Sequence, residues 1–210
     1  MKIENLEILS INSEEFKNYG RVYNYDCSEI VEMCEKIALP EIGVKYVPSE
    51  ASLEKAEINK TIKREVFGNM PIQTGFCWGT NVNMDALEWH KNSEINICGT
   101  DCVLFLAKYE EMNDNFEIHT DKVKAFVARK GDCFEMFATT LHYCPCNADN
   151  DHFRSIVILP LGTNTDLTEN CDDKLVTANN KWLICHDECT ELLNKGVVGG
   201  VHGINFKVEN

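Results

Sequence analysis

The sequence predicts a mainly β protein, in which an antiparallel barrel or sandwich follows a helical N-terminal part. From Ile72 to Gly162 the chain consists of short segments rich in Val, Ile, Phe, Tyr and Trp. Gly, Asn, Asp and Pro interrupt these segments at short intervals, which is typical of strands joined by turns. We therefore expect the β core to span residues 72–162.

The first 71 residues are predicted to be helical or irregular. Ser13 is placed to cap a helix that ends before Gly20, and Ser28 is placed to cap another that stops before Pro40. A third helical candidate, rich in charge, covers residues 49–71. We expect this part to pack on the barrel within a single domain.

The C-terminal extension, residues 163–210, begins with the polar loop "TNTDLTENCDDK". The segment "KWLICHDECTELLNKG" predicts a strand that leads into a short helix with Gly196 at its C-terminal cap. A glycine-rich strand then ends the chain. We expect the extension to pack on the barrel as well.

The composition disfavours several classes of partner. Asp and Glu number 34 against 20 Lys and Arg, a net charge of -14, which repels nucleic acid and anionic lipid. The N-terminus shows no signal-peptide pattern, and no apolar run reaches the ~18 residues of a membrane helix. We expect a cytoplasmic protein with a small-molecule substrate, no nucleic-acid partner and no membrane partner.

The 11 cysteines lie mostly in apolar segments and are expected to be reduced and mostly buried. "HYCPC" and "CHDEC" leave a structural zinc site open as the less favoured alternative, because two pairs at C-x2-4-C spacing are absent.

The segment "ALEWHKNSEIN" places Glu88, His90 and Glu94 close together. If it forms one strand, these side chains point to one face, because side chains alternate along a strand. A second segment, "KGDCFEMFATTLHYCP", contains Glu135 and His142 about fifty residues later. The two segments together predict a mixed histidine and carboxylate site.

The two segments resemble the two motifs of the cupin superfamily. Gly131 and His142 match the glycine and the metal-binding histidine of the second motif in spacing, with Phe137 and Thr139 in place of the usual proline and glycine. The first motif is normally His-x-His followed by Glu, and "EWHKNSE" has Glu88 at the first histidine position.

The resemblance extends to smaller groups. "LEWHKNSEINI" is similar to a strand of the sugar-metabolism cupins and of the ureidoglycolate lyases, and "SEEFKNYGRVY" is similar to the N-terminal segment of the latter. "NMPIQTGFCWGTN", "LEWHKNSEIN" and "ATTLHYCPC" resemble a bacterial cupin-like family of unknown function, about 200 residues long. Members of that family often carry a histidine where Thr80 stands.

This resemblance implies a cupin-type jelly-roll β-barrel with a divalent metal ion (Zn, Mn, Fe or Ni) inside. The implied ligands are His90, Glu94 and His142. Glu88 and Glu135 are the candidates for proton transfer. Cupins commonly dimerise, so a homodimer is expected by analogy.

Lys181 and Trp182 are candidate substrate-binding residues, a cation for an acid group and a flat wall for a sugar ring. A buried tryptophan beside a solvated lysine is the alternative.

Three functions follow from the resemblance. The leading one is a metal-dependent isomerase, epimerase or lyase that acts on a small sugar or sugar acid through a metal-stabilised enediolate. The alternatives are a ureidoglycolate-lyase-like enzyme and a non-catalytic sugar-binding cupin, since one fold supports many chemistries.

Overall fold

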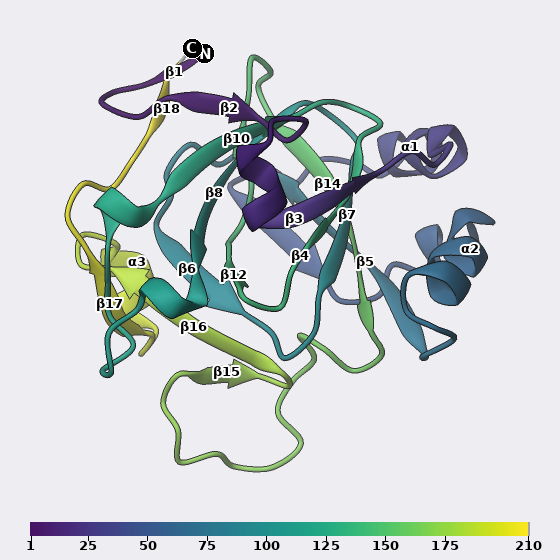
Figure 1. Cartoon of the computed structure of the whole chain (residues 1–210). Helices are drawn as coiled ribbons and strands as arrows, with labels where there is room; N and C mark the ends of the chain where they lie inside the picture. Colours follow the sequence, from purple (N-terminus) through teal and green to yellow (C-terminus); the bar gives the residue numbers. More distant parts are fainter. Residues whose placement is uncertain (210) are drawn as a thin grey trace.

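A computed structural model describes residues 1–209 of the chain and confirms the predicted mainly β fold class, in which curled, mainly antiparallel sheets are joined by N-terminal helices and a C-terminal extension (Figure 1). The larger sheet is antiparallel throughout. Its six strands, in order across the sheet, are β3 (Gly20–Tyr23), β11 (Cys133–Met136), β7 (Glu94–Cys98), β14 (Phe153–Pro160), β5 (Ile72–Gly79) and β4 (Val44–Val47).

A second sheet packs face to face against the first. Its strands are β12 (Thr140–Leu141), β8 (Cys102–Lys108), β10 (Lys124–Ala128) and β2 (Ile8–Ser10), with β13 (Cys146–Asn147) also paired to β8. The space between the two sheets is filled by apolar side chains of both, among them Leu104, Phe126, Phe134 and Phe153. This inner core is the barrel interior that the alternation of apolar residues predicts.

A third sheet, built mainly from the C-terminal extension, covers the outer face of the second. It contains β15 (Val176–Ala178), β16 (Lys181–His186), β17 (Val198–His202) and β9 (Ile118–His119), with β6 (Ala86–Trp89) paired to β16. Leu87 and Ile184 from this sheet pack against Val103 and Phe105 of β8. Part of the C-terminal extension thus packs on the second sheet through apolar side chains.

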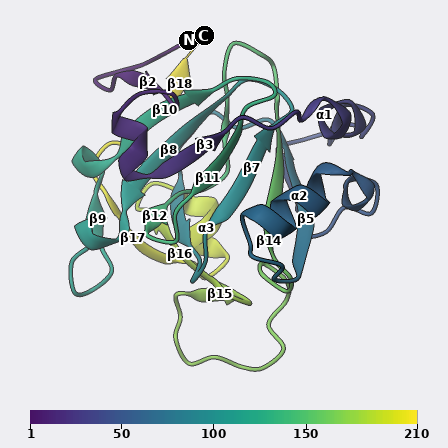
Figure 2. The same ribbon diagram turned by 45° about the vertical axis from the view of Figure 1, so that its right-hand side comes forward.

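The two longer helices lie on the side of the molecule opposite the third sheet (Figures 1 and 2). Helices α1 (Ser28–Glu35) and α2 (Ile58–Glu65) cover the outer face of the large sheet, where Ile30 and Ile62 pack against Ile95 and Ile156. The short helix α3 (Thr190–Asn194) follows β16, as predicted, and Gly196 has a φ of 86° just beyond it. The 3-10 helices are η1 (Glu15–Asn18), η2 (Leu53–Lys55), η3 (Tyr109–Glu111) and η4 (Thr120–Lys122).

The N-terminal part is less helical than predicted, because it supplies strands to the sheets. The helix expected after Ser13 is only the 3-10 helix Glu15–Asn18, and β3 follows it at once. A Cβ atom at Gly20 would collide with the Glu135 carbonyl oxygen, so β3 can approach β11 closely there. Lone edge strands need partners for their backbone groups, and β2, β3 and β4 find them in the barrel.

The two ends of the chain lie together (Figure 1), because β1 (Lys2–Ile3) pairs with β18 (Val208–Glu209). Among the described residues no helix combines the length and the apolar character that crossing a bilayer requires.

Gly79 allows β4 to pair with the end of β5. Its φ is 137°, and a Cβ atom there would collide with the Gly43 carbonyl oxygen. We expect Gly79→Ala to lower the free energy of unfolding by at least about 2 kcal/mol, because strain and collision add.

Gly68→Ala is the matched control. Gly68 also has a positive φ, +56°, but no heavy atom lies within 4 Å of an added Cβ. We expect Gly68→Ala to lower the free energy of unfolding, measured with a denaturant, by only about 1 kcal/mol. An equal loss of unfolding free energy in the two variants would contradict the idea that an added Cβ atom collides at Gly79.

Candidate metal centre

The segment that carries Glu88, His90 and Glu94 crosses from one sheet to another. Strand β6 ends at Trp89 and pairs with β16, whereas β7 begins at Glu94 and pairs with β11 and β14. The prediction of one continuous strand with alternating side chains is therefore wrong. Residues 90–93 form the connection, and its curvature brings the three side chains to one point.

The backbone fixes His142 beside this crossing. The Glu88 N–H donates to the His142 carbonyl oxygen at 2.6 Å, and the His142 N–H donates to the Glu88 carbonyl oxygen at 3.0 Å. This isolated antiparallel bridge places the chain just after β12 next to the end of β6. The structure thus brings together the histidines that lie about fifty residues apart in the sequence.

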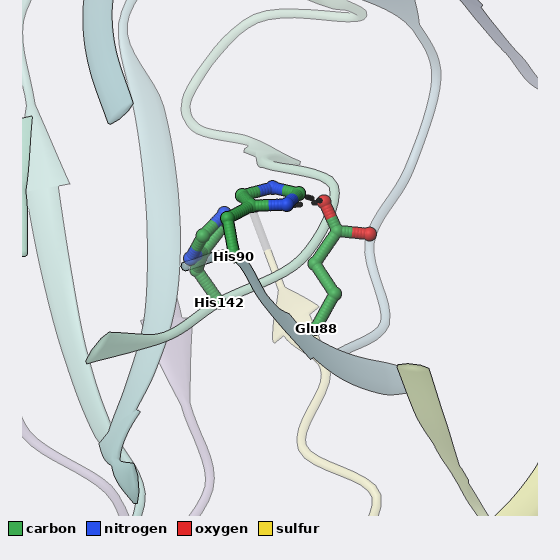
Figure 3. Close-up of side chains that lie close together, drawn as sticks. All are labelled: Glu88, His90 and His142. Atoms are coloured by element: carbon green, nitrogen blue, oxygen red, sulfur yellow. Dashed lines mark ion pairs between the residues drawn. The ribbon is translucent and has the colours of Figure 1, made fainter. Parts of the chain in front are cut away.

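Four side chains converge in this place. The Nε2 atoms of His90 and His142 each lie 3.5 Å from Glu94 Oε2. The same nitrogens lie 3.8 and 3.9 Å from Glu88 Oε1. Figure 3 shows Glu88, His90 and His142, whose ligand atoms all lie within 4.8 Å of one another. All four residues are buried, with at most 8% of their surface exposed.

The imidazole rings are oriented with Nε2 toward the carboxylates. His90 Nδ1 lies 2.8 Å from the Asn180 carbonyl oxygen, and His142 Nδ1 lies 3.0 Å from that of Thr140. A carbonyl oxygen can only accept, so each Nδ1 carries a proton and a neutral ring keeps its lone pair on Nε2. Both Nε2 atoms are buried and have no hydrogen-bond partner.

These atoms fit a metal ion. Ligands bound at about 2.0–2.2 Å in a tetrahedron lie about 3.3–3.6 Å from one another. The separations of Glu94 Oε2 from both imidazoles, 3.5 Å, fall in this range. The slightly longer separations of Glu88 suit a further ligand or a group that acts beside the ion.

Asn96 and Ser155 fix the Glu94 carboxylate. Asn96 Nδ2 donates to Glu94 Oε1 at 2.7 Å, and Ser155 Oγ donates to Asn96 Oδ1 at 2.8 Å. The other carboxylate oxygen, Oε2, is thereby turned toward the histidines. The Lys181 ammonium group similarly forms an ion pair with Glu88 Oε2 and leaves Oε1 facing the imidazoles.

The charges in the centre shift two pKa values in opposite directions. Burial alone would raise the pKa of Glu94, but the nearby imidazoles of His142 and His90 outweigh it and lower that pKa well below its ordinary range. Burial alone would lower the pKa of His142, but the nearby Glu94 carboxylate outweighs it and raises that pKa to about 9. A metal-free centre at neutral pH therefore contains an ion pair, which a bound cation would replace by releasing a proton.

A cavity of about 130 Å³ opens beside the centre. Glu88, Glu94, His142 and Lys181 lie on its wall, together with Asn96. Apolar side chains also line the cavity, among them Leu104, Met136 and Val157.

Trp182 lies away from this cavity. Its ring stacks on Trp89 with centroids 6.5 Å apart, and it belongs to the packing of the third sheet. Consecutive residues of β16 point to opposite faces, so the strand that turns Lys181 toward the cavity turns Trp182 away.

Glu135 also lies away from the centre. Its neighbour Met136 pairs with Glu94 and faces the cavity, which turns Glu135 to the other face of β11. There its carboxylate accepts a hydrogen bond from Tyr23 Oη at 2.8 Å. Thr80, at the expected position of a family histidine, is exposed and donates to the Asp151 carbonyl oxygen.

The cysteines agree with the expectation of reduced thiols, since every one of them is free. Within residues 1–209, the group of Glu88, His90 and His142 is the one place where three or more His, Cys, Asp or Glu side chains could share an ion. The cysteines of "HYCPC" and "CHDEC" belong to no such group in the described part of the chain.

Sequence reasoning missed Asn96 and Asn180. Asn96 has a recognisable signal, because it follows Glu94 by two residues and a strand places both on one face. Asn180 has no such signal in the sequence. Its carbonyl oxygen orients His90, which lies ninety residues earlier in the chain.

The chain is similar to one family of proteins and, distantly, to solved structures of one enzyme. A family model described as "Domain of unknown function (DUF4867)" matches residues 8–206. No curated protein matches significantly. Two solved structures of Bacillus subtilis oxalate decarboxylase, one at pH 4.6 and one concerning its Mn(II) centres, align with TM-scores of 0.35 and 0.34 and identities of 11% and 10%.

Each alignment covers 61% of this chain and 28% of the oxalate decarboxylase chain. A likeness this distant says nothing about the reaction of the present chain.

In the metal-free protein, the ion pair of Glu94 and His142 makes stability depend on pH. The contribution of His142 is complete below its ordinary pKa of 6.5 and is lost as the pH rises through about 9. The contribution of Glu94 is present above its ordinary pKa of 4.5 and is lost at lower pH. We expect the Tm of chelator-treated protein to fall between pH 6.5 and 9.

Glu94→Gln should flatten this fall of Tm with pH, whereas Glu57→Gln, at the exposed N-terminal cap of α2, should leave it unchanged. Thermal unfolding over a pH series measures both. If the Tm of the parent protein changed with pH as little as that of Glu94→Gln, the ion pair between Glu94 and His142 would be contradicted.

Asn96→Ala should weaken divalent metal binding, because Glu94 loses the hydrogen bond that orients it. Partners of metal ligands typically contribute 10- to 100-fold in affinity, and we expect a loss of about this size in calorimetric titration with Zn²⁺. Asn18→Ala, at an exposed position, is the control. An unchanged affinity in Asn96→Ala would show that Glu94 does not depend on Asn96.

Proposed function

The chain belongs to the family described as "Domain of unknown function (DUF4867)", and we propose that it is a divalent-metal-dependent enzyme that acts on a small sugar acid or related sugar metabolite. One observation carries this proposal. Two buried imidazole Nε2 atoms without hydrogen-bond partners face the same carboxylate oxygen, Glu94 Oε2, at 3.5 Å. Unsatisfied buried polar atoms are costly, so their convergence indicates that a ligand completes them.

The proposed ligands of the ion are His90, Glu94 and His142. Two imidazoles and a carboxylate suit Zn, Mn, Fe or Ni, and the donor set alone does not select among them. Three protein ligands leave positions for substrate and water. When bound, the ion would act as a Lewis acid toward adjacent oxygen atoms of the substrate.

Glu88 is the residue that we assign to proton transfer. Its Oε1 lies 0.3–0.4 Å further from the imidazoles than Glu94 Oε2 does, as 3.8 and 3.9 Å compare with 3.5 Å. Its Oε2 pairs with the Lys181 ammonium group, and both side chains line the cavity. Glu88 is thus placed to move a proton of a substrate in the cavity, while Lys181 attracts an acid group.

The cavity limits the size of the substrate. An engineered apolar cavity of about 150 Å³ holds benzene, so a cavity of this order accepts about six to nine non-hydrogen atoms. The present cavity has about 130 Å³. This favours acids of three or four carbons over whole hexoses, and isomerase, epimerase or lyase chemistry on such acids is the reaction class that we propose.

Elemental analysis of the purified protein tests the metal centre. We expect about one divalent ion per chain in the parent and loss of that ion in His90→Ala/His142→Ala, which lacks both imidazoles. His119→Ala/His152→Ala, outside the centre, controls for the removal of two histidines and should keep the ion. Equal metal content in all three proteins would contradict the assignment.

Turnover is tested separately. The metal-loaded parent is screened with hydroxy acids of three and four carbons, with small sugars and with ureido acids. Full turnover after complete removal of the metal would contradict metal dependence. Thermal stabilisation by a ligand without any turnover would favour the non-catalytic binding protein.

A further inference from the structure

A second pair of polar side chains lies on the wall of the same cavity. Asn164 and Tyr46 both line it, together with Glu88, Glu94 and His142. Asn164 Nδ2 donates to Tyr46 Oη at 3.1 Å. Asn164 Oδ1 is buried and has no hydrogen-bond partner. Neither residue takes part in the proposed metal centre, so the free amide oxygen needs another explanation.

The turn that carries Asn164 is held firmly. Gln73, only 2% exposed, donates to the Thr163 carbonyl oxygen and accepts from the Gly162 N–H, both at 2.7 Å. Asn164 itself has a φ of 62°, a conformation that Asn tolerates better than most residues. The amide group is therefore fixed in place, as a binding group should be.

This turn is also linked to the metal centre. Asn180 Nδ2 donates to Thr163 Oγ1 at 3.0 Å, and the Asn180 carbonyl oxygen faces His90 Nδ1 at 2.8 Å. One residue thus joins the Asn164 turn to a proposed metal ligand. The two polar parts of the cavity are built as one rigid unit.

The pair presents one donor and one acceptor. Since the Tyr46 oxygen accepts from Asn164, the Tyr46 O–H proton is free to donate, and Asn164 Oδ1 is free to accept. Exchanging the amide oxygen and nitrogen would give Tyr46 the free acceptor and Asn164 the free donor. Either assignment requires a ligand group that can both accept and donate.

We infer that Asn164 and Tyr46 form a subsite for a hydroxyl or primary amide group of a small acid whose other end lies at the metal centre. This inference rests on the proposed function and narrows its substrate class. A methyl group would leave both protein groups unsatisfied, and a carboxylate could not donate. The subsite therefore selects a polyhydroxy acid or a carbamoyl acid over the corresponding alkyl acid.

Two pairs of isosteric acids test the inference. Glycerate and 2-hydroxybutyrate differ by a terminal hydroxyl in place of a methyl group. N-carbamoylglycine and N-acetylglycine differ by an amide nitrogen in place of a methyl group. Binding of all four to the Zn²⁺-loaded protein is measured by calorimetry, and the metal content of each sample is determined.

In the parent we expect the polar acid of at least one pair to bind about tenfold or more tightly than its partner, because the alkyl acid leaves buried groups unpaired. Tyr46→Phe removes the hydroxyl, and Asn164→Gly removes the amide while keeping the positive φ. Both should reduce the preference to less than about threefold. Tyr25→Phe, which loses a hydroxyl that contacts Glu65 at the surface, should keep it.

Absence of a preference in both pairs, absence of binding of all four acids, or a preference that survives both variants would overturn the inference. With normal metal content, these outcomes leave the metal centre standing. A parent that takes up no metal would overturn the proposed function and the inference with it.

Discussion

The carboxylates of Glu88 and Glu94 and the imidazoles of His90 and His142 are buried together. The charge of each group is stabilised by its neighbours. Removing a charge from water costs several kcal/mol unless a partner compensates it. Glu94 has both imidazoles at 3.5 Å, and Glu88 has Lys181 as its partner. The surrounding structure serves this arrangement, because Asn96, Asn180 and Thr140 fix the orientation of the charged groups. The divalent cation proposed above would bind His90, Glu94 and His142 at once.

The position of the centre follows from the layered architecture. The chain leaves the third sheet at Trp89 and enters the large sheet at Glu94, so the connection passes the end of the barrel. His142 meets this connection through its backbone bridge to Glu88. Side chains from three parts of the chain therefore face one cavity, while two sheets and their apolar core keep the walls rigid.

Local patterns were enough to predict the β core and the later helices, and they singled out His90, Glu94 and His142, which the structure brings together. They failed where long-range pairing decides. The alternation of side chains between two faces implied a continuous strand from Glu88 to Glu94. The two ends of this segment in fact pair with different sheets. Strand β3 could not be predicted because its partner, β11, lies over a hundred residues away. The same reason hides Asn164 and Tyr46, whose meeting depends on how β4 and the turn after β14 pack.

The central claim is that His90, Glu94 and His142 bind one divalent ion. Anomalous diffraction from crystals grown with Zn²⁺ tests it most directly. We expect a single strong peak about 2.0–2.2 Å from the Nε2 atoms of both histidines and from a Glu94 oxygen. No peak at that place, or a peak bound by cysteines elsewhere, would contradict it.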